Sequence, residues 1–120
     1  MQTVAVIGAS SDRNKFGNKA LRGFQRAGYK VVPVNRNENE IEGLKVYSSV
    51  LDVPFKVDIA TIYVSPEIGE KIVKEVAQKN IPELWINPGA ESAELMMRAK
   101  EFGLQTVLGC SLLAIGQNLE

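Results

Sequence analysis

The sequence has no histidine and only one cysteine among its 120 residues. The absence of histidine excludes His-ligated metal sites, and it excludes the Ser–His and Cys–His pairs of nucleophilic enzymes. The single cysteine, Cys110, cannot form an internal disulfide, and a free cysteine is more often a small buried hydrophobic side chain than a reactive group. We also find no pair of carboxylates spaced for general acid and base catalysis. We therefore predict no metal site, no catalytic residue and no enzymatic activity.

The sequence also lacks an excess of either charge, because 14 basic residues balance 14 acidic residues. A nucleic-acid-binding domain usually carries a broad basic surface, so we expect no nucleic-acid partner. No apolar run approaches the roughly 20 residues that cross a bilayer, so we expect no membrane contact. Met1 leads directly into an apolar strand, which argues against a signal peptide and favours the cytoplasm. With 45% hydrophobic residues, residues 1–120 are predicted to form a single domain.

Strand-like and helix-like segments alternate along the whole chain. The expected strands are the apolar run from Thr3 to Gly8, followed by Lys30–Val34, Val57–Val64, Glu83–Ile86 and Leu104–Leu108. Helical spacing of apolar residues lies between most of them; one such face is Ile68, Ile72, Val73, Val76 and Ala77. This alternation predicts an α/β, Rossmann-like, doubly wound fold. Its five-stranded parallel sheet would have the order 3-2-1-4-5, with helices on both faces.

The loop after the first strand is the strongest indication of a ligand. Ser10 to Gly17 lie where a strand passes into a helix, and the amides and dipole of a helix N-terminus suit phosphate. The loop has no G-x-G-x-x-G fingerprint, and the second strand ends in Asn35-Arg36 rather than in a carboxylate. Both departures argue against an NAD site. Arg36 could still hold the 2′-phosphate of NADP, or it could be a solvated cation in a turn.

Four loops should meet at the carboxyl edge of the sheet, where ligands bind in doubly wound folds. They follow the first four strands, and they contain the residues Ser10 to Gly17, Asn35-Arg36, Ser65-Pro66 and Asn87-Pro88-Gly89. A ligand at this edge would therefore contact residues from all four loops.

Short motifs from this edge and from the strands occur in the order typical of a known family. They are Val6-Ile-Gly-Ala-Ser10, Lys15-Phe-Gly17, Gly28-Tyr29, Val32-Pro-Val-Asn35, Ile41-Glu-Gly43, Val46-Tyr47, Val57-Asp58, Pro88-Gly89 and Cys110. With this ordered set, the chain resembles the small stand-alone CoA-binding proteins. Their fold is similar to the nucleotide-binding domain at the start of the succinyl-CoA synthetase alpha subunit.

The resemblance implies that CoA or an acyl-CoA binds with its ADP part along the first two strands. The Ser10 to Gly17 loop would approach the pyrophosphate, and Asn35 with Arg36, which could meet the 3′-phosphate, would lie near the adenosine. Val64 to Pro66 would flank the adenine or the pantetheine, and Asn87 to Gly89 would face the pantetheine arm. The full set of binding residues implied in this way is Gly8, Ala9, Ser10, Ser11, Arg13, Lys15, Phe16, Gly17, Asn35, Arg36, Val64, Ser65, Pro66, Asn87, Pro88 and Gly89.

Three functions are compatible with these residues. The first is non-catalytic binding of CoA or acyl-CoA by a sensor, carrier or regulatory module, because the phosphorylated histidine of the synthetase has no counterpart here. The second is an NADP-binding module like those of oxidoreductases, which Asn35-Arg36 favours. The third is a degenerate Rossmann domain that acts through contacts with a protein partner whose identity the sequence does not indicate. Cys110 follows the fifth strand, so it could instead lie near the thiol end of a pantetheine.

Overall fold

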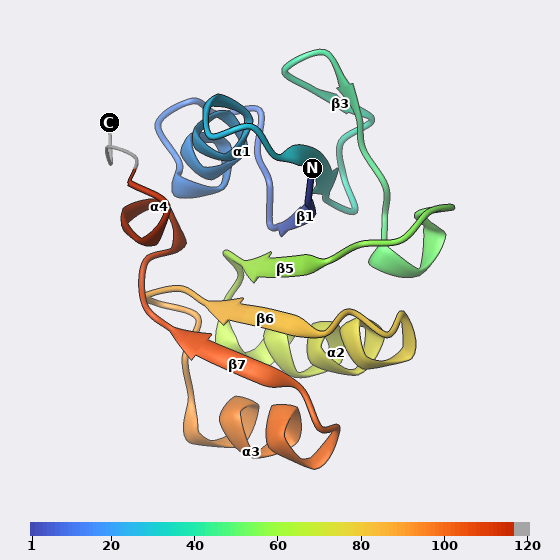
Figure 1. Cartoon of the computed structure of the whole chain (residues 1–120), viewed down its shortest axis with the longest axis vertical. Coiled ribbons are helices and arrows are strands. Elements are labelled where there is room, and N and C mark those ends of the chain that lie inside the picture. The colour runs from blue at the N-terminus through green and yellow to red at the C-terminus, as the bar shows by residue number, and fades with distance from the viewer. Residues whose placement is uncertain (117–120) are drawn as a thin grey trace.

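A central parallel sheet organises the structure, a computed structural model that describes residues 1–116 apart from the side chains of Pro66 and Leu112. Its strands are β1 (Thr3–Ile7), β2 (Lys30–Val34), β5 (Ile59–Ile62), β6 (Glu83–Ile86) and β7 (Gln105–Leu108), in the order β2-β1-β5-β6-β7 (Figure 1). The helices are α1 (Phe16–Arg26), α2 (Pro66–Gln78), α3 (Ala93–Glu101) and the short α4 (Ser111–Ala114). A small hairpin, β3 (Glu40–Ile41) with β4 (Leu44–Lys45), and the 3₁₀ helix η1 (Val50–Asp52) separate β2 from β5.

The Rossmann-like α/β fold with a five-stranded parallel sheet is confirmed. Its strand order follows the 3-2-1-4-5 pattern when a rudimentary third strand is counted at the β2 edge, and β7 then adds a sixth strand at the opposite edge. At the β2 edge, Tyr47 forms an isolated parallel bridge with Val34. The position expected for the segment 57–64, at the edge of the sheet beyond β2, is corrected. This segment contributes β5, which pairs with β1 on the other side, with Val4 opposite Ile59. The chain from the hairpin to Tyr47 already occupies the place beyond β2, so β5 continues the sheet on the other side of β1.

Helices cover both faces of the sheet, as predicted, because successive residues of β1 point to opposite faces. Val4 and Val6 pack in one apolar cluster with Phe24 of α1, whereas Ala5 and Ile7 pack in a second cluster with residues of α2 and α3. In Figure 1, α1 and α4 accordingly lie on one side of the sheet, and α2 passes behind β6 on the other. The near-continuous apolar character of the strands follows from burial on both faces.

Serine side chains cap two of the helices. Ser92 caps α3 by accepting a hydrogen bond from the amide of Leu95 at 3.0 Å, and Ser49 caps η1 in the same way through the amide of Leu51. Ile68, which was predicted on the apolar face of α2, is 51% exposed. Ile68 lies in the first turn of α2, beyond the end of β5, where it lines a cleft instead of covering the sheet.

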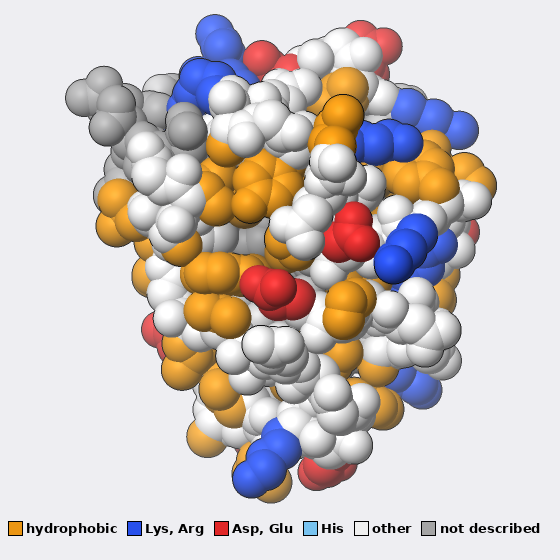
Figure 2. Space-filling model, viewed as in Figure 1, with side chains coloured by type: hydrophobic (Ala, Val, Ile, Leu, Met, Phe, Trp, Pro, Cys, Tyr) orange, Lys and Arg blue, Asp and Glu red, His pale blue; other side chains and the backbone are white. Residues whose placement is uncertain are grey.

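The surface agrees with the balanced composition. On the face shown in Figure 2, basic and acidic side chains are interspersed, and hydrophobic side chains lie between them. Within residues 1–116, no helix has the length and apolar character needed to cross a membrane.

Candidate functional site

Two glycines allow the loop after β1 to pass close to its neighbours. Gly8 has φ +95°, and a Cβ atom at this position would lie 2.6 Å from the carbonyl oxygen of Tyr63, just after β5. A Cβ atom on Gly17, in the first turn of α1, would overlap the carbonyl oxygen of Gly8. The spacing of Gly8 and Gly17, which departs from a dinucleotide fingerprint, is therefore explained by two close approaches of the backbone.

Two amide side chains, one of them fully buried, hold this loop in place. Asn18 is fully buried; its Nδ2 donates to the carbonyl oxygen of Ser10 at 2.8 Å, and its Oδ1 accepts from Nε of Arg22 at 2.7 Å. Nδ2 of Asn35 donates to the carbonyl oxygen of Ala9 at 2.7 Å. The loop is thus fixed by side chains from α1 and from the end of β2, which reduces the ordering that a ligand would have to impose.

The N-terminus of α1, at the end of this loop, presents hydrogen-bond donors that no other group uses among the described residues. Lys15 is the N-cap residue, and its side chain makes no capping hydrogen bond. Among the described residues, the amides of Phe16 and Gly17 have no hydrogen-bond partner. Unpaired amides at the positive end of a helix dipole, next to the basic N-cap residue Lys15, form a suitable environment for a phosphate group.

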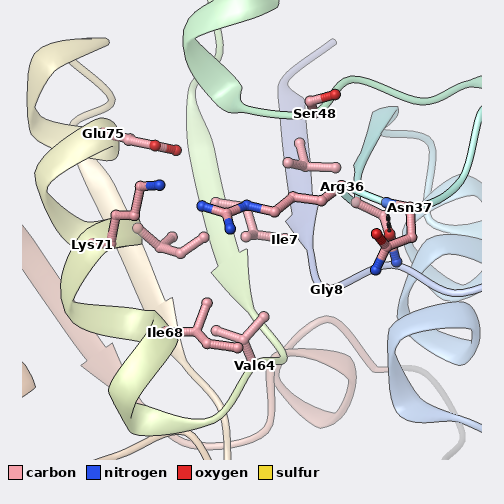
Figure 3. A pocket seen from close by; sticks show the side chains of 12 residues that line it. Ile7, Gly8, Arg36, Asn37, Ser48, Val64, Ile68, Lys71 and Glu75 are labelled. Carbon is pink, nitrogen blue, oxygen red and sulfur yellow. Dashed lines mark hydrogen bonds between the residues drawn. The ribbon is translucent and has the colours of Figure 1, made fainter.

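A first cleft of about 190 Å³ lies between the loop after β2 and helix α2 (Figure 3). Apolar side chains of β1, β2 and α2 form its walls, among them Ile7, Val34 and Ile72. Arg36 and Lys71 line it from opposite sides, and their side chains point toward each other in Figure 3. The cleft therefore combines an apolar wall, suited to a flat ring system, with two basic groups.

A second cleft of about 250 Å³ lies between the N-terminus of α1 and the loop after β6. Lys15, Phe16 and Tyr63 line it together with Pro88 and the residues that follow. Gly8 and Val64 line both clefts. The two clefts therefore adjoin across the carboxyl ends of β1 and β5, where the strand order reverses.

Nine of the sixteen candidate residues line one cleft or both: Gly8, Lys15, Phe16, Gly17, Asn35, Arg36, Val64, Pro88 and Gly89. Ala9, Ser10, Ser11, Arg13, Ser65 and Asn87 line neither of them, and the side chain of Pro66 is outside the description. Some of these six have other partners. Arg13 forms an ion pair with Glu42 at 3.6 Å, and the amide of Ser11 donates to Glu38 at 3.1 Å.

The side chain of Asn87 is directed into the protein rather than toward a ligand. It is 1% exposed, its Nδ2 donates to Oγ1 of Thr61 at 2.6 Å, and its Oδ1 accepts from the amide of Ser111 at 2.9 Å. Ser111 in turn bonds to the hydroxyl of Tyr63 at 2.8 Å. Burial raises the pKa of the Tyr63 hydroxyl above its ordinary value. These bonds tie β5, β6 and α4 together, because buried polar groups require partners.

Several cleft residues were not identified from the sequence: Ser48, Ile68, Lys71, Ile72 and Glu75. Four of them lie on α2 at positions i, i+3, i+4 and i+7, which is one face of a helix. This spacing, directly after a strand, is the signal that could have identified them. Cys110 is half-buried, packs against the apolar cluster on the α1 side and lines neither cleft. No group of three or more potential metal ligands occurs among the described residues.

A parallel sheet with clefts at its carboxyl edge, beside the N-terminus of the first helix, defines the chain as a Rossmann-like domain of the nucleotide-binding class. Comparison with known families then identifies it: the chain matches the CoA binding domain family over residues 2–116 and belongs to that family.

Known proteins similar to the chain fall into two size classes. A conserved hypothetical protein from Pyrococcus furiosus superimposes with a TM-score of 0.89 at 36% identity, over 95% of this chain and 99% of that one. The alpha subunit of ADP-forming acetate–CoA ligase II from the same organism is 38% identical over 79 residues, which are 65% of this chain and 17% of the ligase subunit. The dinucleotide-forming acetyl-coenzyme A synthetase 1 of Ca. Korarchaeum cryptofilum has a TM-score of 0.78 at 30% identity, over 88% of this chain and 25% of that protein. The chain thus spans only a fraction of the enzymes that it matches.

Proposed function

We propose that this protein binds CoA or an acyl-CoA across the two adjoining clefts. The observation that carries the proposal is the junction at Gly8 and Val64, which connects an apolar cleft with basic groups to the unpaired amides at the start of α1. CoA has the matching sequence of parts: an adenosine, a pyrophosphate and a long, largely neutral arm. The family match supports CoA and gives no support to NADP.

The parts of the ligand follow from the chemistry of each cleft. The pyrophosphate would lie against the amides of Phe16 and Gly17, with Lys15 supplying charge. The adenosine would occupy the first cleft, between Val64 and Arg36. The pantetheine arm would extend through the second cleft toward Pro88 and Gly89.

We further propose that binding, without turnover, is the role of this chain, as in a sensor, a carrier or a regulatory module. Of the described residues lining the first cleft, Glu75 is the one carboxylate; it accepts a hydrogen bond from Oγ of Ser49 at 2.8 Å, and no second carboxylate lies there to form an acid and base pair. The similar ligase subunit is several times longer than this chain, and the similarity covers 17% of it. A cytoplasmic location is part of this proposal.

Calorimetric titration of the purified chain with CoA, acetyl-CoA and NADP tests the proposal. We expect CoA to bind and NADP to bind at least about tenfold more weakly. Lys15→Glu should weaken CoA by about tenfold or more, because the reversed charge faces the pyrophosphate. Lys100→Glu, at the exposed end of α3, is the matched control and should leave the affinity unchanged.

Tight NADP binding in the absence of CoA binding would overturn the assignment of the ligand. Unchanged CoA affinity in Lys15→Glu would remove Lys15 from the site. Release of free thiol from acetyl-CoA during incubation with the chain would contradict binding without turnover.

A further inference from the structure

Two basic side chains enter the first cleft from opposite sides. Arg36 extends from the loop after β2, and Lys71 extends from the second turn of α2 (Figure 3). Among the described residues, neither side chain forms an ion pair or a hydrogen bond. Two like charges that face each other repel, and an anion between them would remove this repulsion.

The surroundings of the two cations leave them available. Ile68 and Ile72 flank Lys71 on α2 and cannot pair with it. Of the described residues that line this cleft, Glu75 is the one carboxylate, and it bonds to Ser49 rather than to Lys71 or Arg36. The basic groups therefore outnumber the acidic one, and the excess charge of the cleft is positive.

We infer that Arg36 and Lys71 together form a subsite for a phosphate monoester on the ribose of the bound nucleotide, which in CoA is the 3′-phosphate. The inference rests on the proposed function, in which the pyrophosphate occupies the start of α1. A phosphate group in the first cleft must then be one that is not part of the pyrophosphate. A phosphate monoester carries nearly two negative charges at neutral pH, which matches one guanidinium and one ammonium group.

Lys71 is the specificity-determining residue in this arrangement. Arg36 follows β2, where an arginine accommodates the 2′-phosphate of NADP in dinucleotide-binding folds, but one exposed cation contributes little binding energy by itself. Lys71 supplies the second charge from a helix whose position is fixed by packing against α3. The pair should therefore distinguish CoA from dephospho-CoA, which lacks the 3′-phosphate and is otherwise identical.

The test is a set of calorimetric titrations with CoA and with dephospho-CoA. The readout is the ratio of the two dissociation constants, measured for the wild type, Lys71→Gln and Lys74→Gln. Lys74 is the matched control because it is an exposed lysine on the same helix that does not line the cleft. We expect the wild type to favour CoA by at least about tenfold, Lys71→Gln to reduce this preference several-fold, and Lys74→Gln to retain it.

A further variant tests the sign of the effect. Glu75→Gln keeps an oxygen that can accept the hydrogen bond from Ser49 but removes the negative charge, so the preference for CoA should rise. Equal affinity of the wild type for both ligands, or an unchanged preference in Lys71→Gln, would overturn the inference while the proposed function stands. Failure of both ligands to bind would overturn both.

Discussion

Replacement of Asn18 by alanine should both destabilise the fold and weaken CoA binding, because this one buried side chain holds the loop after β1. Its amide donates to the carbonyl oxygen of Ser10 at 2.8 Å and to Glu42 at 3.2 Å, and it accepts from Arg22 at 2.7 Å. A hydrogen bond contributes about 1 kcal/mol net, and about 1.5–3 kcal/mol when one partner is charged. Arg22 and Glu42 are accessible to water and recover part of this, so we expect a loss of about 2–3 kcal/mol in the free energy of unfolding.

Urea denaturation measures this loss. With a urea dependence of about 2 kcal/mol per molar, the midpoint should fall by about 1 M or slightly more. Ordering one freed loop residue costs about 1–2 kcal/mol, so the affinity for CoA should fall by roughly tenfold. Asn14→Ala is the control for stability, since Asn14 is exposed in the same loop and its side chain has no hydrogen bond with any described residue. A loss below about 0.5 kcal/mol in Asn18→Ala would refute the role assigned to Asn18.

Three further predictions concern other parts of the structure. Gly17→Ala should lower the free energy of unfolding by about 1–3 kcal/mol, because the added methyl group meets the carbonyl oxygen of Gly8. An unchanged midpoint of thermal unfolding would contradict this. Burial raises the pKa of Tyr63, so the stability that this residue contributes is present below the unfolded tyrosine pKa of about 10 and is lost as the pH rises through the higher folded value. Between pH 8 and about pH 11, the free energy of unfolding measured in urea should therefore fall less in Tyr63→Phe than in the wild type. Cys110 packs against the α1-side cluster and lines neither cleft, so CoA disulfide should add no CoA to the folded protein; a mass gain of one CoA that Cys110→Ser abolishes would show the opposite.

Features that repeat along the chain were predictable from the sequence. The apolar strands and the intervening helices define the sheet, and serine caps such as Ser92 mark helix starts, because these signals act between residues that are close in sequence. The loop from Ser10 to Gly17 was placed correctly at the carboxyl edge for the same reason. Its position follows from the strand before it and the helix after it.

Features that depend on contacts between distant segments were not predictable in this way. Tyr47 takes the place beyond β2 through a single bridge, which no local pattern indicates, and the segment 57–64 consequently pairs with β1. Asn87 follows a strand at the ligand edge, yet its side chain turns inward because Thr61 and the amide of Ser111 lie beneath it. Lys71 looks like an ordinary exposed helix residue until α2 is placed opposite Arg36.

The most direct test of the account is to map CoA binding on the backbone amides by NMR during a titration of the full chain. We predict that the largest shifts fall on both sides of the junction, at Gly8, Phe16 and Gly17 and at the residues around Arg36 and Gly89. Shifts confined to the α4 side of the sheet, or spectra that do not change at millimolar CoA, would contradict the claim that the two clefts form one CoA site.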